Sequence, residues 1–367
     1  MNIKNIANNL KRIRNVKGFK QEELATKAGL SRVAYSSIES AKSEPRVSNL
    51  QSLADALGVS IEELIKPIPH VSSLRFRSKK MLNTKENCKR EQIVMDIAYW
   101  LNDFNYLENE LSHKHVFKLK DCHGNTPEEM AKSARKKLNL KEDEAINDIG
   151  GLLENAGIKI KLIACELNNF FGLSAFDKEG NPAVVVNVSD EVSVERQIFT
   201  AAHELGHILL HKNSYIPTEV KEPQQQEDEA DQFASYFLMP RDAFQKSWDE
   251  NKGLHWVDNV LHIKRIYKIS YRSVLKRLIE QGVSDQIYMK FYQFYKIKFG
   301  KDLKNNREPF PLEKIDFIED RLSKLVRESY EKELISFNKA AEILKIDNES
   351  MRERVNSWEW KALNDII

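Results

Sequence analysis

The pentapeptide His203-Glu204-Leu205-Gly206-His207 constrains this chain more than any other stretch. Residues four apart lie on one face of an α-helix, so a helix here presents both imidazoles to a single point. Glu204 adjoins the first histidine and can reach a water molecule held at that point. Two nitrogen ligands, a carboxylate base and an open coordination position together make a hydrolytic zinc site. The apolar residues in 198–209 predict that this helix is buried; the alternative is a core helix with incidentally spaced histidines.

The third metal ligand is expected in the acidic run 227–231, which begins a second predicted helix. Glu227 can complete a His-His-Glu set, and Asp231, four residues later, can accept the free N–H of a ligating histidine. Glu229 is the competing ligand, but it lies about 200° around the helix from Glu227, so both cannot face the metal. The run also suits a solvated first turn, where the helix dipole favours carboxylates. His211 falls on the ligand face, where it can donate to substrate or water, or lie behind the ligands.

Three segments around this site carry a family resemblance: F-T-A-A-H-E-L-G-H-I-L-L-H, E-x-x-A-D-x-F-A and L-M-P. Together with the apolar stretch 182–187, which is similar to a sheet edge before the active helix, they resemble the ImmA/IrrE family of zinc metallopeptidases. The resemblance implies that His203, His207 and Glu227 bind Zn2+ and that Glu204 is the general base.

Residues 1–67 predict a compact all-helical unit. The segment 21–28 is closed by Gly29, and Ser31 is a good N-cap for the next helix. The helix, glycine turn and helix over 21–39 have the spacing of a helix-turn-helix. Residues 1–67 hold eleven Lys and Arg against seven Asp and Glu, a difference of +4, which favours a polyanionic partner.

The run R-x-x-x-G-F-K-Q-E-E-L-A-x-K-A-G-L-S-R-x-x-Y-S-x-I-E-S resembles the Cro/CI (XRE) family of repressors, and the match extends from Leu10 to Leu64. The resemblance implies that the helix after Ser31 enters the major groove of double-stranded DNA. It implies roles in DNA binding for five residues: Gln21, which docks the preceding helix, and Ser31, Arg32, Tyr35 and Ser36 on the recognition helix. Because one such helix covers few base pairs, we expect a homodimer on a palindromic operator. Folds of this kind also serve as protein-interaction modules.

We predict a multidomain, mainly α protein in four parts: the helix-turn-helix domain 1–67, a basic linker and long helix 68–118, a metallopeptidase domain 119–250 and a helical region 251–367. Prolines and basic residues mark a joint over 66–90, in which 74–77 is expected to be a short strand. The peptidase domain should be α+β and zincin-like, with about three strands, at 157–163, 173–176 and 183–187. An exposed strand edge beside the active helix would let an extended substrate pair with it.

The composition is that of an ordinary globular protein: 41% of the 367 residues are hydrophobic, 31% are charged, and the net charge is +2. No apolar run is long enough to span a membrane, and the N-terminus has no signal-peptide core. Three scattered cysteines indicate a reducing compartment without a disulfide framework. We therefore expect a cytoplasmic protein.

Two hypotheses follow for the function. In the first, the chain is a DNA-binding regulator with a zinc endopeptidase that cleaves a regulatory protein, foremost a helix-turn-helix repressor as the ImmA/IrrE resemblance implies. Cleavage of its own joint at 66–90 is the lesser version of this hypothesis. In the second, the chain is a repressor or antitoxin whose peptidase-like region senses a partner and does no chemistry. The complete ligand set favours the first, because a sensor has no need of Glu204.

Overall fold

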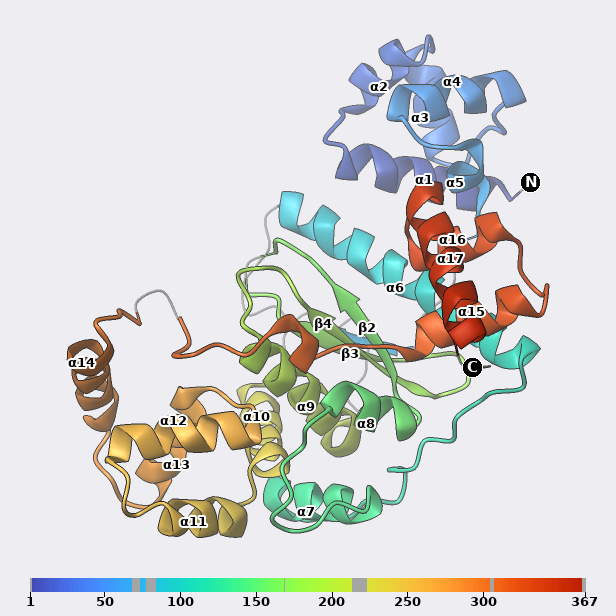
Figure 1. Cartoon of the computed structure of the whole chain (residues 1–367). Coiled ribbons are helices and arrows are strands. Elements are labelled where there is room, and N and C mark those ends of the chain that lie inside the picture. Colours follow the sequence, from blue (N-terminus) through green and yellow to red (C-terminus); the bar gives the residue numbers. More distant parts are fainter. Residues whose placement is uncertain are drawn as a thin grey trace. The chain divides into compact units, whose positions relative to one another are not determined.

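The computed structural model of the chain describes residues 2–67, 73–76, 84–167, 169–212, 223–303 and 307–364. The chain divides into two compact units (Figure 1), namely Met1–Val71 with Lys80–Leu107, and Ser72–Lys79 with Glu108–Ile367. The division confirms a multidomain, mainly helical protein with an all-helical N-terminus. The four domain boundaries expected from the sequence remain predictions.

The first unit is built from short helices: α1 (Ile3–Val16), α2 (Gln21–Lys27), α3 (Arg32–Glu39), α4 (Val47–Leu57) and α5 (Ile61–Ile65). Hydroxyl caps begin two of them, because the Ser31 side chain accepts the N–H of Ala34 and the Ser60 side chain accepts that of Glu63. The apolar faces meet in one core that includes Leu10, Leu24, Tyr35, Leu50, Leu53 and Leu64. This unit is the helical fold that residues 1–67 predict.

The long helix α6 (Thr84–Glu110) follows the joint, and its residues up to Leu107 cluster with the first unit. Arg12 on α1 donates a hydrogen bond of 2.7 Å to the Gln92 side chain on α6. The ammonium of Lys66 lies 4.8 Å from the centre of the Tyr99 ring. These contacts hold α6 against the helix-turn-helix region.

The second unit contains a four-stranded sheet of β1 (Ser73–Phe76), β2 (Lys159–Ile163), β3 (Gly172–Phe176) and β4 (Pro182–Asn187), in the order β1-β3-β4-β2. Strands β1 and β3 are antiparallel, as are β3 and β4, whereas β2 runs parallel to β4. The three strands predicted for the peptidase region are confirmed. The strand expected in the basic joint joins them as a fourth, while residues 68–72 and 77–83 of that joint lie outside the described residues.

Helix α9 (Val194–Leu210) packs on β3 and β4 and carries the histidine motif. Its first turn is anchored by Glu195, which is fully buried and accepts hydrogen bonds from the Lys264 ammonium at 2.5 Å and the Leu312 N–H at 2.9 Å. Helix α10 (Gln224–Leu238) packs along α9. A Cβ on Gly206 would lie 3.0 Å from the Phe233 ring, so the glycine permits the close approach of the two helices.

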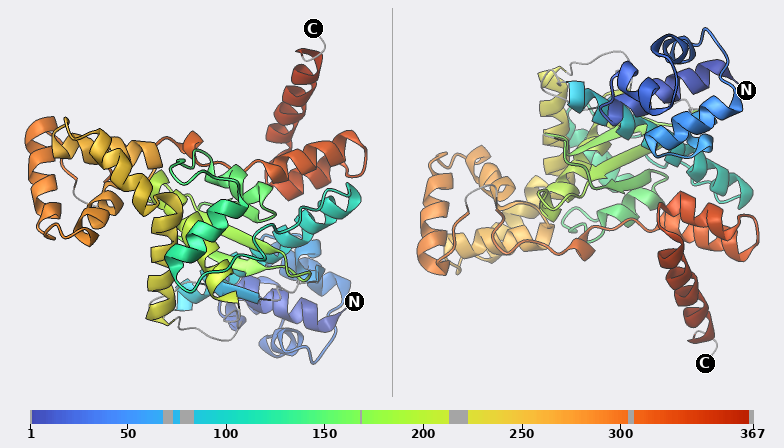
Figure 2. Two further views of the ribbon diagram at one scale, coloured as in Figure 1. Left: turned by 90° about the horizontal axis from the view of Figure 1, so that it is seen from below. Right: turned by 90° about the horizontal axis from the view of Figure 1, so that it is seen from above.

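The remaining helices of this unit are α7 (Pro127–Lys137), α8 (Ile149–Asn155), α11 (Arg241–Glu250), α12 (Trp256–Tyr267), α13 (Tyr271–Glu280), α14 (Ile287–Phe299), α15 (Arg321–Glu331), α16 (Phe337–Leu344) and α17 (Asn348–Asn364). Helices α12–α14 and α15–α17 lie on opposite sides of the sheet (Figure 2). Buried side chains from before and after residue 250, such as Phe244 and Phe291, share one apolar core.

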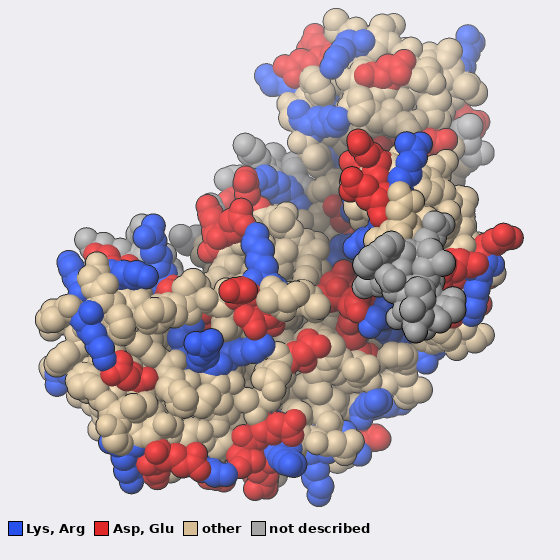
Figure 3. All heavy atoms as spheres, in the orientation of Figure 1, with Lys and Arg blue, Asp and Glu red and all other residues tan. Residues whose placement is uncertain are grey.

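None of the helices in the described ranges combines the length and the apolar character needed to cross a bilayer. On the face drawn in Figure 3, basic and acidic side chains of the second unit are interspersed. This pattern agrees with the nearly balanced net charge of +2. Charge therefore has to be interpreted site by site.

Candidate metal centre

Helix α9 brings the two motif histidines together in the interior. The Nε2 atoms of His203 and His207 are 2.9 Å apart, and the two residues are only 1% and 2% exposed. Their rings approach edge to face, at an interplanar angle of 86°. The four-residue spacing thus produces the convergence that it predicts, because one helical turn separates the two side chains.

Glu227, near the start of α10, supplies the third group. Its Oε1 atom lies 3.2 Å from His207 Nε2, and its Oε2 atom lies 3.8 Å from His203 Nε2. The ligand atoms of the three residues all lie within 4.8 Å of one another, and Glu227 is 3% exposed. A buried carboxylate facing two imidazole nitrogens is a donor set that suits Zn2+.

Asp231 sets the tautomer of His203. Its Oδ1 atom is 2.8 Å from His203 Nδ1. A carboxylate accepts hydrogen bonds, so Nδ1 carries the proton and the lone pair of Nε2 points toward Glu227 and His207. The structure places Asp231 where the sequence predicts a supporting carboxylate.

A second relay reaches His207 through His211. Glu229 Oε2 lies 2.8 Å from His211 Nε2, and His211 Nδ1 lies 3.0 Å from His207 Nδ1. If Glu229 is ionised, it accepts the Nε2 proton of His211, whose bare Nδ1 then accepts from His207 Nδ1. The hydrogen bond from His211 lowers the pKa of Glu229 and so favours this ionised form.

The two relays leave Nε2 of both His203 and His207 as a hydrogen-bond acceptor. These two nitrogens converge with the Glu227 carboxylate in a buried space. Buried groups that can only accept need a donor or a cation, so the residues fit a metal ion. Among the described residues, these are also the only His, Cys, Asp or Glu side chains grouped closely enough to hold one. Glu229, the competing candidate, contacts His211 instead.

Glu204 lies beside this group and is held by Ser174, a residue that is not among those expected from the sequence. Ser174, in the middle of β3, donates a hydrogen bond of 2.7 Å to Glu204 Oε2, and both residues are buried. A Cβ on Gly172 would lie 2.5 Å from Thr200 and 3.7 Å from Glu204, so a small residue is needed where β3 meets α9. Ser174 belongs to a predicted strand, but nothing in its local sequence indicates a partner 30 residues away.

A cavity of about 420 Å³ lies next to the metal centre. Asp231 contributes to its lining, together with Phe171, Arg196 and Phe199. The Arg196 guanidinium stacks over the Phe171 ring at 4.2 Å from the ring centre. The cavity therefore presents aromatic and cationic side chains close to Asp231, the residue that supports His203.

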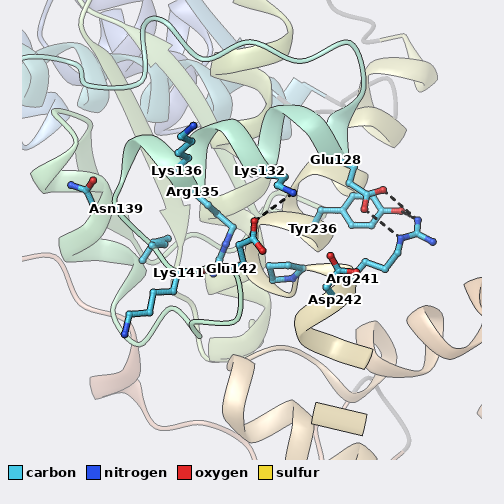
Figure 4. A pocket seen from close by; sticks show the side chains of 12 residues that line it. Glu128, Lys132, Arg135, Lys136, Asn139, Lys141, Glu142, Tyr236, Arg241 and Asp242 are labelled. Carbon is cyan, nitrogen blue, oxygen red and sulfur yellow. Dashed lines mark hydrogen bonds and ion pairs between the residues drawn. The ribbon is translucent and has the colours of Figure 1, made fainter. Parts of the chain in front are cut away.

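A second cavity, of about 560 Å³, involves α7 and the segment from α10 to α11 (Figure 4). Charged side chains of both signs line it and pair with one another. Arg241 contacts Glu128 at 3.3 Å, and Lys132 contacts Glu142 at 3.5 Å. None of the metal-centre residues lines this cavity.

In the first unit, the residues expected to act in DNA binding differ in their exposure to solvent. Ser31 and Arg32 are exposed at the start of α3, and Ser36 is half-buried. Gln21 donates a hydrogen bond of 2.7 Å to Glu39, so it joins α2 to α3 as expected of a docking residue. Tyr35 differs from the expectation: it is fully buried, and burial raises the pKa of its hydroxyl. Its ring packs in the core because residues 35 and 38 share the inner face of α3.

Fold and site together define a helix-turn-helix protein with a candidate metallopeptidase centre. Family models match both parts: residues 10–64 match the helix-turn-helix family, and residues 156–279 match the IrrE N-terminal-like domain of peptidase family M78. The chain belongs to the HTH-type transcriptional regulators and carries an M78 peptidase domain.

The curated relatives match a short part of this chain. An HTH-type transcriptional regulator from Sinorhizobium fredii, y4dJ, is 42% identical over 62 residues, which are 17% of this chain and 80% of the relative. The regulator YqaE of Bacillus subtilis is 33% identical over 78 residues, 21% of this chain and 67% of YqaE. The crystal structure of a hypothetical transcription factor from Neisseria, NHTF, is 37% identical over 18% of this chain and 75% of its own, with a TM-score of 0.18.

Proposed function

We propose that this protein is a DNA-binding regulator whose second unit is a zinc-dependent endopeptidase acting on a regulatory protein. One observation carries the proposal: His203, His207 and Glu227 converge in a buried space beside Glu204, a carboxylate held by Ser174. A structural core has no need for three acceptors at one point. A peptidase needs both this ligand set and a carboxylate base next to it.

Each residue of the metal centre has a distinct role in the proposed peptide hydrolysis. Bound at this centre, zinc would lower the pKa of water and polarise the scissile carbonyl. Glu204 takes the proton of the attacking water and delivers it to the leaving amine. Ser174 keeps the Glu204 carboxylate in place while Asp231 and His211 orient the histidines. The cavity beside Phe199 accommodates a side chain of the substrate.

The substrate class that we propose is a helix-turn-helix regulator. The support is the resemblance to ImmA/IrrE peptidases together with the helix-turn-helix domain in the same chain. We further propose that the first unit binds a two-fold symmetric operator as part of a homodimer, because one recognition helix gives too little specificity alone.

The test of the enzyme begins with the metal. Elemental analysis of the purified protein should give about one zinc per chain, and Glu227→Ala should lose it. Asp228→Ala is the matched control, since it removes a carboxylate of the same turn that contacts Gln224 and leaves the three convergent groups and their supporting residues intact. Loss of zinc in Glu229→Ala but not in Glu227→Ala would move the third ligand to Glu229.

The test of the chemistry compares the wild type with Glu204→Gln, which should retain zinc and lose proteolysis. Each protein is incubated alone and with the regulator encoded beside its gene, and fragments are followed by mass spectrometry. Cleavage of the added regulator by the wild type alone supports the proposal. If neither protein is cut while a ligand or partner alters DNA binding, the second unit is a sensor and the enzyme proposal is wrong.

A further inference from the structure

Strand β1 comes from the joint before α6, whereas the other three strands of the sheet lie between residues 159 and 187. Residues 73–76 cluster with the second unit, whereas the described segments before and after them, residues 2–67 and 84–107, cluster with the first. The chain therefore leaves its helical unit, contributes four residues to the sheet as Ser73–Phe76, and returns. No other strand of the described sheet is supplied in this way.

The strand that β1 covers is the one that contacts the catalytic glutamate. In the sheet order β1-β3-β4-β2, removing β1 would make β3 the edge. The register pairs Arg75 with Ser174, the residue whose hydroxyl donates to Glu204. The backbone of β1 thus runs past the point where the metal centre meets the sheet.

An unpaired edge at this position would be a binding surface for an extended polypeptide. A sheet edge offers a row of N–H and C=O groups, and an extended peptide that adds to it gains main-chain hydrogen bonds whatever its side chains are. A peptide antiparallel to β3 would also run past Ser174, whose hydroxyl contacts Glu204. The β3 edge therefore meets the geometric need of an endopeptidase that holds its substrate in extended form.

We propose that residues 73–76 of this chain are a resident competitor for the β3 edge, the edge at which an extended segment of the substrate regulator would pair. This inference rests on the endopeptidase function proposed above. Within the described residues, the four-residue resident strand pairs only with β3, whereas β4 is paired on both sides. A short edge strand is the element of a sheet that opens most readily. Substrate then binds when β1 leaves, so pairing of residues 73–76 with β3 controls access to the edge.

The test frees the edge by changing the backbone of β1. Successive N–H groups along a strand point to opposite sides, so Leu74→Pro with Arg75→Pro removes at least one hydrogen bond to β3. Leu74→Ala with Arg75→Ala is the matched control, because it removes the same side chains and keeps both N–H groups. All full-length proteins carry Glu204→Gln, so that the measurements do not depend on cleavage.

Two measurements are made on these proteins. Hydrogen–deuterium exchange should show that amides of β3 that face β1 exchange at least tenfold faster in the proline variant, while β4 amides keep their protection. A fluorescein-labelled peptide spanning residues 71–78 should bind the proline variant at least tenfold more tightly than the wild type or the alanine control. Equal peptide binding by all three proteins would overturn the proposal. So would loss of protection in β4, because β1 would then be a structural strand that cannot leave.

A third arm separates this proposal from the endopeptidase itself. With Glu204 restored, the proline variant should cleave the regulator at least threefold faster than the alanine control. Faster exchange and tighter peptide binding without cleavage by any variant would leave the pairing site standing and contradict the enzyme.

Discussion

The Ser174 hydroxyl donates a 2.7 Å hydrogen bond to the Glu204 carboxylate, joining the middle of β3 to the motif helix across a buried interface. A hydrogen bond to a charged acceptor in such a place contributes about 1.5–3 kcal/mol. It fixes the position of a carboxylate that has to face both a water molecule and a leaving amine.

Replacing this serine should reduce catalysis without removing the metal. We expect Ser174→Ala to lower the cleavage rate roughly tenfold or more, because the base is no longer held in one orientation. Elemental analysis of the same preparation should still show one zinc, since Ser174 touches none of the ligand atoms in the contacts described. Unchanged kcat in a zinc-loaded Ser174→Ala protein would show that Ser174 has no role in catalysis.

The relay behind His207 should act as one unit. We expect His211→Ala and Glu229→Ala each to weaken zinc binding by roughly 10- to 100-fold, as other supporting groups of metal ligands do. The double variant should be no weaker than the worse single variant, because Glu229 acts only through His211. Competition titration with a fluorescent zinc chelator measures all three.

Asp228→Ala is the control for that series. Asp228 lies in the same exposed turn, but its carboxylate contacts Gln224 and not the relay. It should bind zinc as the wild type does. Additive losses in the double variant, or an equal loss in Asp228→Ala, would mean that the effect is general charge removal.

Two neighbouring positions on α3 should give opposite kinds of defect. Arg32 is exposed, so Arg32→Ala should weaken operator binding by about 1–3 kcal/mol if it contacts a base, with unchanged thermal unfolding. Tyr35 is fully buried, so Tyr35→Ala should destabilise the first unit by roughly 3–5 kcal/mol through the cavity that it leaves. Gel shifts and circular dichroism on both proteins separate the two effects. A stable Tyr35→Ala protein with specific loss of DNA binding would mean that Tyr35 contacts DNA.

Glu154 should make the second unit less stable as the pH rises. Its carboxylate accepts the Arg321 N–H at 3.3 Å, and burial, followed by the charge of Glu319, raises its pKa to about 7. In the unfolded chain its pKa is near 4.5, so between about pH 4.5 and 7 the unfolded state loses this proton first and stability falls.

The measurement is the change in unfolding temperature between pH 5 and pH 8. Glu154→Gln should remove a pH-dependent loss on the order of 2 kcal/mol, allowing for partial screening by solvent. Glu353→Gln, at an exposed position of α17, should leave the loss in place. An identical pH dependence in wild type and Glu154→Gln would show that Glu154 ionises normally.

The fold was predictable where the signal is local. Ser31 begins α3 because a hydroxyl can cap a helix that starts one residue later. The three strands of the peptidase region follow from short apolar runs between turns. The burial of Tyr35 was not predicted, because the family resemblance places it on a recognition helix and the packing of α3 places it in the core.

The sequence by itself determined that His203 and His207 share a helix face, since a spacing of four is a property of one helix and needs no partner. It also indicated that the third metal ligand comes from the acidic run 227–231. Only the tertiary structure decided that Glu227 faces the histidines while Glu229 faces His211, because that depends on how α10 lies against α9. The contact of Ser174 with Glu204 and the pairing of β1 with β3 join segments 30 and about 100 residues apart in the chain, a proximity that no local pattern records.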